Sequence, residues 1–160
     1  MISFLVFGNF TAKTEPLDKE NCKLNFAAIS DIHMTDDSLR SLMLGFGLHD
    51  MENADARLDA LVCSGDLTDH GYKEQWELLA DTFADYDPAD NIILAQGNHD
   101  TWTEDEGYNL AKDYFIKYSE QITGRKIENE YYSTKVNGYT FIVLASETDR
   151  TAMYMSDAQL

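Results

Sequence analysis

The chain has 160 residues, of which 44% are hydrophobic and 12% aromatic, a composition typical of one globular domain with its own core. Its formal net charge is −17, from 29 acidic and 12 basic residues, which argues against a role in coating nucleic acid, and no apolar stretch of the sequence is long enough to span a membrane. The acidity also has a second interpretation, because carboxylates that bind divalent cations would let a phosphate group approach. Composition leaves both interpretations open.

The first 23 residues are predicted to form a strand and a linker ahead of a domain that comprises residues 24–160. Residues 2–7 are apolar, but no basic residue precedes them, so a strand is favoured over a secretory signal peptide. Cys22 and Cys63 lack the neighbours of a zinc or redox motif and are interpreted as free thiols. Strong acidity and few cysteines favour a cytoplasmic protein, and an exported parent protein is the open alternative.

Three apolar runs, residues 24–29, 58–63 and 91–95, are predicted strands, and each precedes a segment with large apolar residues at helical spacing. This alternation favours consecutive βαβ units and a largely parallel sheet. Gly45 and Gly47 are expected to weaken the first helix or to end it early. The aromatic stripes of the second and third helices are assigned to the core. The helical positions are Leu39, Leu42, Met43 and Phe46, then Tyr72, Trp76, Leu79 and Phe83, then Tyr108, Ala111, Phe115, Tyr118 and Ile122.

The last third of the chain changes character. Residues 131–136 and 139–145 flank Asn137-Gly138, a dipeptide that suits a two-residue hairpin turn, so an antiparallel pair of strands is expected after the parallel ones.

Ser156 and Gln159 have the spacing of a capping box, which marks the start of a helix. Because Leu160 is the last residue of the sequence, this helix start predicts a domain that is truncated after about its first half to two-thirds.

Each of the first three predicted strands ends in a polar cluster: Ser30-Asp31-Ile32-His33, then Ser64-Gly65-Asp66-Leu67-Thr68-Asp69, then Gln96-Gly97-Asn98-His99-Asp100. Ligands bind outside the carboxyl ends of parallel strands, so the three clusters should gather at one edge of the sheet. Any one cluster alone is more simply a solvated turn or a helix cap. Their repetition in the same position favours a functional site.

The residue types in these clusters are those of a metal site. Asp31 and His33 are two positions apart and would point the same way in an extended segment. Asp66 has two carboxylate oxygens with which to bridge two ions, and Asn98 offers an uncharged oxygen. Mixed imidazole and oxygen ligation suits manganese, iron or zinc better than calcium.

The motifs Asp31-Ile32-His33, Gly65-Asp66-Leu67-Thr68-Asp69 and Gly97-Asn98-His99-Asp100 resemble the first three signature motifs of the calcineurin-like metallophosphoesterases, and the resemblance spans roughly residues 24 to 146. It implies an α/β fold in which two mixed β-sheets are flanked by helices. It also implies hydrolysis of small phosphomonoesters or phosphodiesters at a dinuclear metal centre.

The resemblance also implies a role for each matching residue. Asp31 and His33 would bind the first metal ion, Asp66 would bridge both ions, and Asn98 would bind the second. His99 would face the phosphate and protonate the leaving oxygen, and Asp69 would orient His99.

The sequence departs from the family pattern in two places. Later motifs of the family supply further metal ligands, a lone histidine and a Gly-His-x-His loop, but no histidine follows His99 here, so the site is expected to be incomplete within these residues. His49 lies outside those motifs and is assigned to the surface. His70-Gly71 stands where protein phosphatases of the family have an arginine, which favours the phosphodiesterase-like and small-substrate branches. His70 is left open between a substrate contact and a solvated loop residue.

Two alternatives to a metallophosphoesterase are kept. A metal-binding or interaction module without turnover is favoured by the missing histidines, and opposed by the presence of His99 and Asp69, which binding alone does not need. A nucleotide-binding α/β domain of another kind is disfavoured because the sequence has no glycine-rich phosphate loop. The oligomeric state is not predicted.

Overall fold

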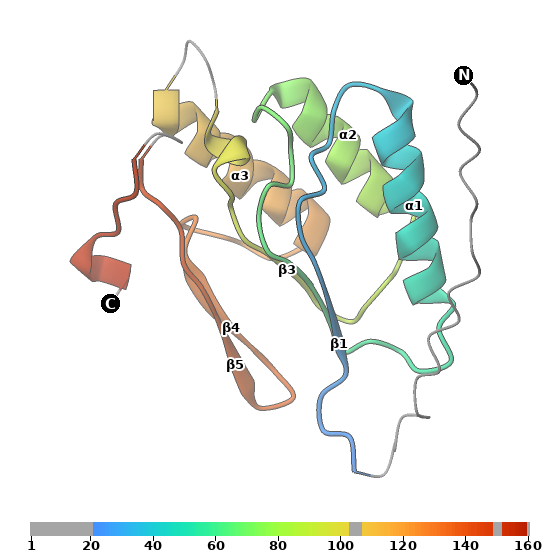
Figure 1. Cartoon of the computed structure of the whole chain (residues 1–160). Coiled ribbons are helices and arrows are strands. Elements are labelled where there is room, and N and C mark those ends of the chain that lie inside the picture. The colour runs from blue at the N-terminus through green and yellow to red at the C-terminus, as the bar shows by residue number, and fades with distance from the viewer. Residues whose placement is uncertain (1–20, 103–106, 149–151, 160) are drawn as a thin grey trace, which may run out of the picture.

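The computed structural model describes residues 21–102, 107–148 and 152–159 (Figure 1). The strand predicted for residues 2–7 and most of the predicted linker lie outside the described residues. The elements alternate strand and helix and then give way to a hairpin. In chain order they are β1 (Phe26–Ile29), α1 (Ser38–Glu52), β2 (Ala60–Cys63), α2 (Lys73–Ala84), β3 (Ile92–Leu94), η1 (His99–Thr101), α3 (Gly107–Thr123), β4 (Tyr132–Val136), β5 (Tyr139–Val143) and η2 (Asp157–Gln159).

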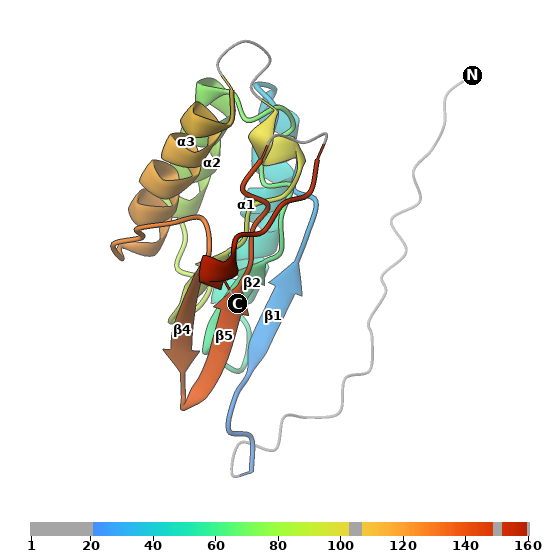
Figure 2. The same cartoon turned by 90° about the vertical axis from the view of Figure 1, so that its left-hand side faces the viewer.

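Strands β1, β2 and β3 form a parallel sheet in that order, as the βαβ pattern predicted. Figures 1 and 2 show helices α1, α2 and α3 on one side of this sheet and the β4–β5 hairpin on the other. Strand residues alternate between two cores: Leu61 and Leu94 face the helices, whereas Ala60 and Ile93 pack with Val136 of the hairpin. The predicted α/β class with two sheets is confirmed, and in the described residues the helices cover the parallel sheet only.

The core between the helices and the sheet is built from the aromatic stripes of α2 and α3. Trp76 stacks on Tyr118 with ring centroids 6.1 Å apart and meets Phe115 edge-on, and all three side chains are buried. This confirms most of the predicted core. The assignment of Tyr72 was wrong: it is the N-cap of α2 and lies where the loop meets the helix, so its side chain is 39% exposed.

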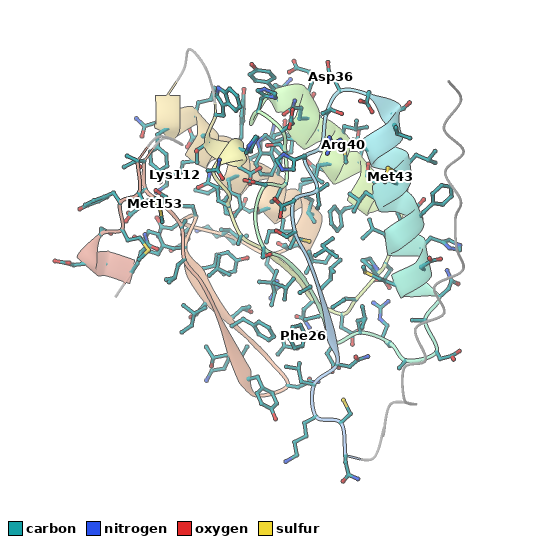
Figure 3. The ribbon with its side chains drawn as sticks, in the orientation of Figure 1. Phe26, Asp36, Arg40, Met43, Lys112 and Met153 are labelled. Atoms are coloured by element: carbon teal, nitrogen blue, oxygen red, sulfur yellow. The ribbon has the colours of Figure 1, made fainter. Side chains whose placement is uncertain are left out.

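Helix α1 runs through both of its glycines, so the predicted early end is wrong. The absence of a side chain at Gly45 has a packing role, because a Cβ there would lie 2.9 Å from the Tyr86 hydroxyl. This contact between α1 and Tyr86 offsets the low helix propensity of glycine. The apolar stripe of α1 faces outward, and Figure 3 labels one of its members, Met43, on the helix. Its members Leu39, Leu42, Met43 and Phe46 are each more than half exposed. None of the described helices combines the length and apolarity needed to cross a bilayer.

The hairpin turn between β4 and β5 has the predicted form. Asn137 and Gly138 both have positive φ, 49° and 85°, as the favoured two-residue turn requires. The Tyr132 hydroxyl fixes the hairpin to the parallel sheet, since it accepts from the Leu94 N–H at 3.1 Å and donates to the Leu94 carbonyl at 2.7 Å.

The predicted capping box is wrong in its contacts. Residues Asp157–Gln159 form only a short 3₁₀ turn, and the Ser156 N–H donates to a Glu147 carboxylate oxygen at 2.6 Å. The Gln159 amide instead pairs with the backbone of Ala145, accepting from its N–H at 3.1 Å and donating to its carbonyl at 2.9 Å. Gln159 therefore anchors the C-terminal segment to the end of β5, a partner that local spacing cannot reveal.

Candidate metal centre

The three polar loops that follow β1, β2 and β3 meet at the carboxyl edge of the parallel sheet, as predicted. The Asp31 N–H donates to the Gly65 carbonyl at 3.1 Å and the His33 N–H to the Asp66 carbonyl at 2.9 Å, which joins the first loop to the second. The His99 N–H donates to Asp66 Oδ1 at 3.0 Å and joins the third loop to the second. Figure 2 shows the arrow of β1 pointing toward this end of the molecule.

Three of the predicted ligands have left-handed backbone conformations. Asp31, His33 and Asp66 have φ values of 56°, 46° and 49°, a region that residues other than glycine seldom occupy. The chain is therefore not extended at Asp31 and His33, and the reason predicted for their convergence was wrong. They meet because the backbone curls around the site. Strained residues of this kind cluster at functional sites, where surrounding contacts hold them.

Asp31, His33 and Asp66 present a set of donor atoms that fits a divalent cation. His33 Nε2 lies 3.6 Å from Asp31 Oδ1 and 3.8 Å from Asp66 Oδ2, and one donor atom from each residue lies within 4.8 Å of the others. Ligand atoms around one transition-metal ion are about 3–3.5 Å apart, given metal–ligand bonds of about 2.1 Å. Two carboxylates and an imidazole within this spacing match oxygen and nitrogen ligation by zinc, iron or manganese.

The Asp69 carboxylate determines which nitrogen of His33 faces these carboxylates. Its Oδ1 lies 3.1 Å from His33 Nδ1, and because a carboxylate can only accept, Nδ1 carries the proton and donates it to Asp69. The lone pair of Nε2 then points to Asp31 and Asp66. Metal-binding histidines commonly donate their other ring N–H to a carboxylate, which fixes the tautomer and raises the basicity of the ligand. Asp69 therefore orients His33.

The backbone carbonyl of Asp69, rather than its carboxylate, contacts His99. The Asp69 carbonyl lies 2.7 Å from His99 Nδ1, whereas the carboxylate oxygen Oδ1 lies 3.9 Å away. The other carboxylate oxygen, Oδ2, lies 2.9 Å from Nδ1 of His70. His33, Asp69 and His99 thus form a second group with metal-ligand chemistry, but their facing atoms are already joined by hydrogen bonds, and we assign this group to positioning.

Asn98, the fourth predicted ligand, lies immediately before the 3₁₀ turn of His99–Thr101. Its backbone carbonyl accepts from the Thr101 hydroxyl at 2.8 Å, and its exposed side chain lines a cavity of about 390 Å³ beside the C-terminal segment. Its neighbour His99 is bonded to Asp66, so Asn98 belongs to the same edge of the site. A direct meeting of the Asn98 amide with the other donors stays a prediction.

Asp100 had no predicted role, yet its carboxylate joins the second and third loops. Its fully buried carboxylate accepts the N–H groups of Leu67 at 3.1 Å, Thr68 at 2.7 Å and Gly97 at 2.8 Å, and the Thr68 hydroxyl at 2.8 Å. Burial raises the pKa of Asp100 to about 6, and these donors oppose that rise. The only signal in the sequence was its place as the last residue of the third cluster, which by itself indicates turn chemistry.

Glycines allow the loops to approach this closely. A Cβ at Gly97 would lie 2.1 Å from the Asp66 nitrogen, and a Cβ at Gly71 would lie 2.6 Å from the Asp100 carbonyl oxygen. Gly71 also has a φ of 67°. The second and third loops therefore depend on glycine at these positions, because any side chain would push them apart.

Residues 24–154 match the family model described as calcineurin-like phosphoesterase. The match includes the three loops and both sheets, and it confirms the family that the motifs resemble. No curated protein matches the chain at a significant level. The Asp31, His33 and Asp66 donors form a candidate ligand group, which agrees with the metal-binding character of this family.

Asp100→Asn should separate the second and third loops. The amide would place an N–H₂ group against backbone donors, and buried donors without acceptors cost about 1–3 kcal/mol. We expect urea denaturation to show a loss of about 3 kcal/mol in the free energy of unfolding. Asp85→Asn, an exposed acidic residue after α2, is the matched control and should change it little. Equal stability of the two variants would contradict the role given to Asp100.

Manganese should stabilise the folded protein through the three converging donors. At a concentration one hundred times the dissociation constant, a bound ion adds about 2.7 kcal/mol to the free energy of unfolding. His33→Ala should remove most of this effect, as measured by thermal denaturation with and without Mn²⁺. His49→Ala is the control, because its side chain is 62% exposed on α1. A manganese effect that survives in His33→Ala would place the ion elsewhere.

Proposed function

Because the chain belongs to the calcineurin-like phosphoesterase family, we propose that it hydrolyses small phosphoric esters in a metal-dependent reaction. One observation carries the proposal: Asp31, His33 and Asp66 converge, and Asp69 orients His33 so that its Nε2 lone pair faces the two carboxylates. A structural role alone does not require three left-handed residues to bring like-charged groups together.

Asp31 and His33 would hold a first divalent cation, Asp66 would bridge it to a second, and Asn98 would hold the second. Manganese, iron and zinc suit this set of oxygen and nitrogen ligands. Bound cations would neutralise the phosphoryl oxygens and lower the pKa of a water molecule placed for in-line attack. The protein contributes position and electrostatics, as phosphoryl transfer requires.

His99 is the group that would protonate the leaving oxygen. Its Nδ1 is held by the Asp69 carbonyl, which leaves Nε2 as the atom able to give a proton to substrate. Its ring meets the His33 ring edge-on with centroids 4.5 Å apart, so the acid lies beside a proposed metal ligand. A module that only binds metal has no need of this arrangement.

His70-Gly71 replaces the arginine of protein phosphatases, which favours small substrates and phosphodiesters over phosphoproteins. A second candidate function is metal binding without turnover, which needs the Asp31, His33 and Asp66 donors but not His99. The two candidates differ in what they demand of His99, and that difference can be tested.

Asp66→Ala should abolish nearly all hydrolysis of bis-p-nitrophenyl phosphate and p-nitrophenyl phosphate in the presence of Mn²⁺, because the proposed bridge between the ions is lost. Release of p-nitrophenolate measures the rate. Asp50→Ala removes the same charge from a side chain that is 89% exposed on α1, and it should retain full activity. Activity that persists in Asp66→Ala would remove Asp66 from the bridging role.

His99→Gln should slow the hydrolysis of phenyl phosphate more than that of p-nitrophenyl phosphate. A poor leaving group needs the proton, and general acid catalysis contributes about 10²-fold or more to such a step. The affinity of the variant for Mn²⁺, measured by calorimetric titration, should change little. Full activity on phenyl phosphate in this variant would exclude His99 as the acid. If the unaltered protein and the variant both fail to hydrolyse either ester, metal binding without turnover is favoured.

A further inference from the structure

A row of aromatic rings leads away from the proposed acid. Tyr72 stacks on His70 with ring centroids 5.4 Å apart and planes 15° from parallel, and His70 lies 4.4 Å from Trp102. Trp102 in turn meets His99 at 5.6 Å, and His99 meets His33 at 4.5 Å. We call Tyr72, His70 and Trp102 the ring wall. It begins beside the site and ends at a tyrosine that is 39% exposed.

The ring wall is held by the loops that form the candidate metal centre. The His70 N–H donates to the side-chain oxygen of Gln75 at 2.8 Å, and His70 Nδ1 lies 2.9 Å from an Asp69 carboxylate oxygen. Gln75 is buried, and Gly71 packs directly against the Asp100 carbonyl. These contacts hold His70 against the loops, although its side chain is 31% exposed. Its position is fixed relative to Asp69 and His99.

The place of the ring wall decides which part of a substrate it would meet. In ester hydrolysis, water adds to phosphorus, the bond between phosphorus and the leaving oxygen breaks, and that oxygen takes a proton from the acid. The leaving alcohol must therefore lie next to His99. The His99 ring contacts Trp102, with centroids 5.6 Å apart, as well as the proposed metal ligand His33, with centroids 4.5 Å apart. The group carried by the leaving oxygen would extend along the ring wall.

We propose that the ring wall is a leaving-group subsite, selective for phosphoric esters whose alcohol carries a planar aromatic ring, either an aryl group or a nucleobase. The proposal rests on the phosphoesterase function proposed above. Rings that are partly exposed can stack on a ligand ring, and base–aromatic stacking tolerates any base because every base has a π-face. The side chains of His70 and Tyr72 retain such exposure, 31% for His70.

Two pairs of substrates with leaving groups of similar acidity test the subsite. Adenosine 5′-monophosphate and ribose 5-phosphate differ in the base, and methyl phenyl phosphate and methyl hexafluoroisopropyl phosphate differ in an aryl ring against a fluoroalkyl group. We expect kcat/KM to be roughly tenfold or more higher for the ringed member of at least one pair. A preference confined to the first pair assigns the subsite to nucleosides, and one confined to the second assigns it to aryl groups.

Variants locate the preference. Trp102→Leu and Tyr72→Leu should each reduce the ratio of kcat/KM within the preferred pair toward one, mainly through KM for the ringed substrate, and Trp102→Phe should restore most of it. Tyr139→Leu, an exposed tyrosine on β5, is the matched control and should keep the ratio. Circular dichroism verifies the fold of each variant.

The outcomes separate this proposal from the function on which it rests. Hydrolysis of all four esters with ratios near one, or a preference that both leucine variants retain, would overturn the subsite and leave the phosphoesterase standing. Hydrolysis of none of the four esters, at millimolar Mn²⁺, would overturn both.

Discussion

The carboxylate of Asp100 supplies bonds that neither strand nor helix provides at the end of the sheet. Beyond Cys63 and Leu94 the chain leaves the parallel ladder, and backbone N–H groups in the loops need new acceptors. The two oxygens of Asp100 take up three of them, from Leu67, Thr68 and Gly97. A buried carboxylate is costly unless it is bonded in this way, so the loops and the carboxylate stabilise one another. This pairing holds the second and third loops together.

The site combines strain with like charge. Asp31, His33 and Asp66 occupy left-handed backbone conformations, and the two carboxylates approach the same imidazole nitrogen. Each feature alone is unfavourable, at about 1–3 kcal/mol for a strained residue. A divalent cation bound as proposed would compensate the charge, and the contacts between the loops maintain the conformations.

Errors in the predictions have specific physical causes. Gly45 did not end α1, because its missing side chain makes room for Tyr86, and tertiary packing outweighs a propensity of about 1 kcal/mol. The predicted cap failed because Gln159 found a better partner in the backbone of Ala145. Tyr72 fitted a helical stripe by spacing, yet it lies at the end of the helix, where the stripe no longer faces the core. For Gly45 and Gln159, a contact distant in sequence replaced a local one.

Residue types and their order were enough to predict the parallel strands, the hairpin turn and the convergence of Asp31, His33 and Asp66, because alternation, turn chemistry and the polar ends of strands can be read along the chain. The hydrogen-bond partners of Asp69 could not be predicted from residue types and their order. Its carboxylate turns to His33 and its carbonyl to His99, because loops thirty or more residues apart meet at one edge of the sheet. Only the folded arrangement defines that proximity, since hydrogen bonds and ring contacts between loops depend on distances in space that sequence spacing does not encode.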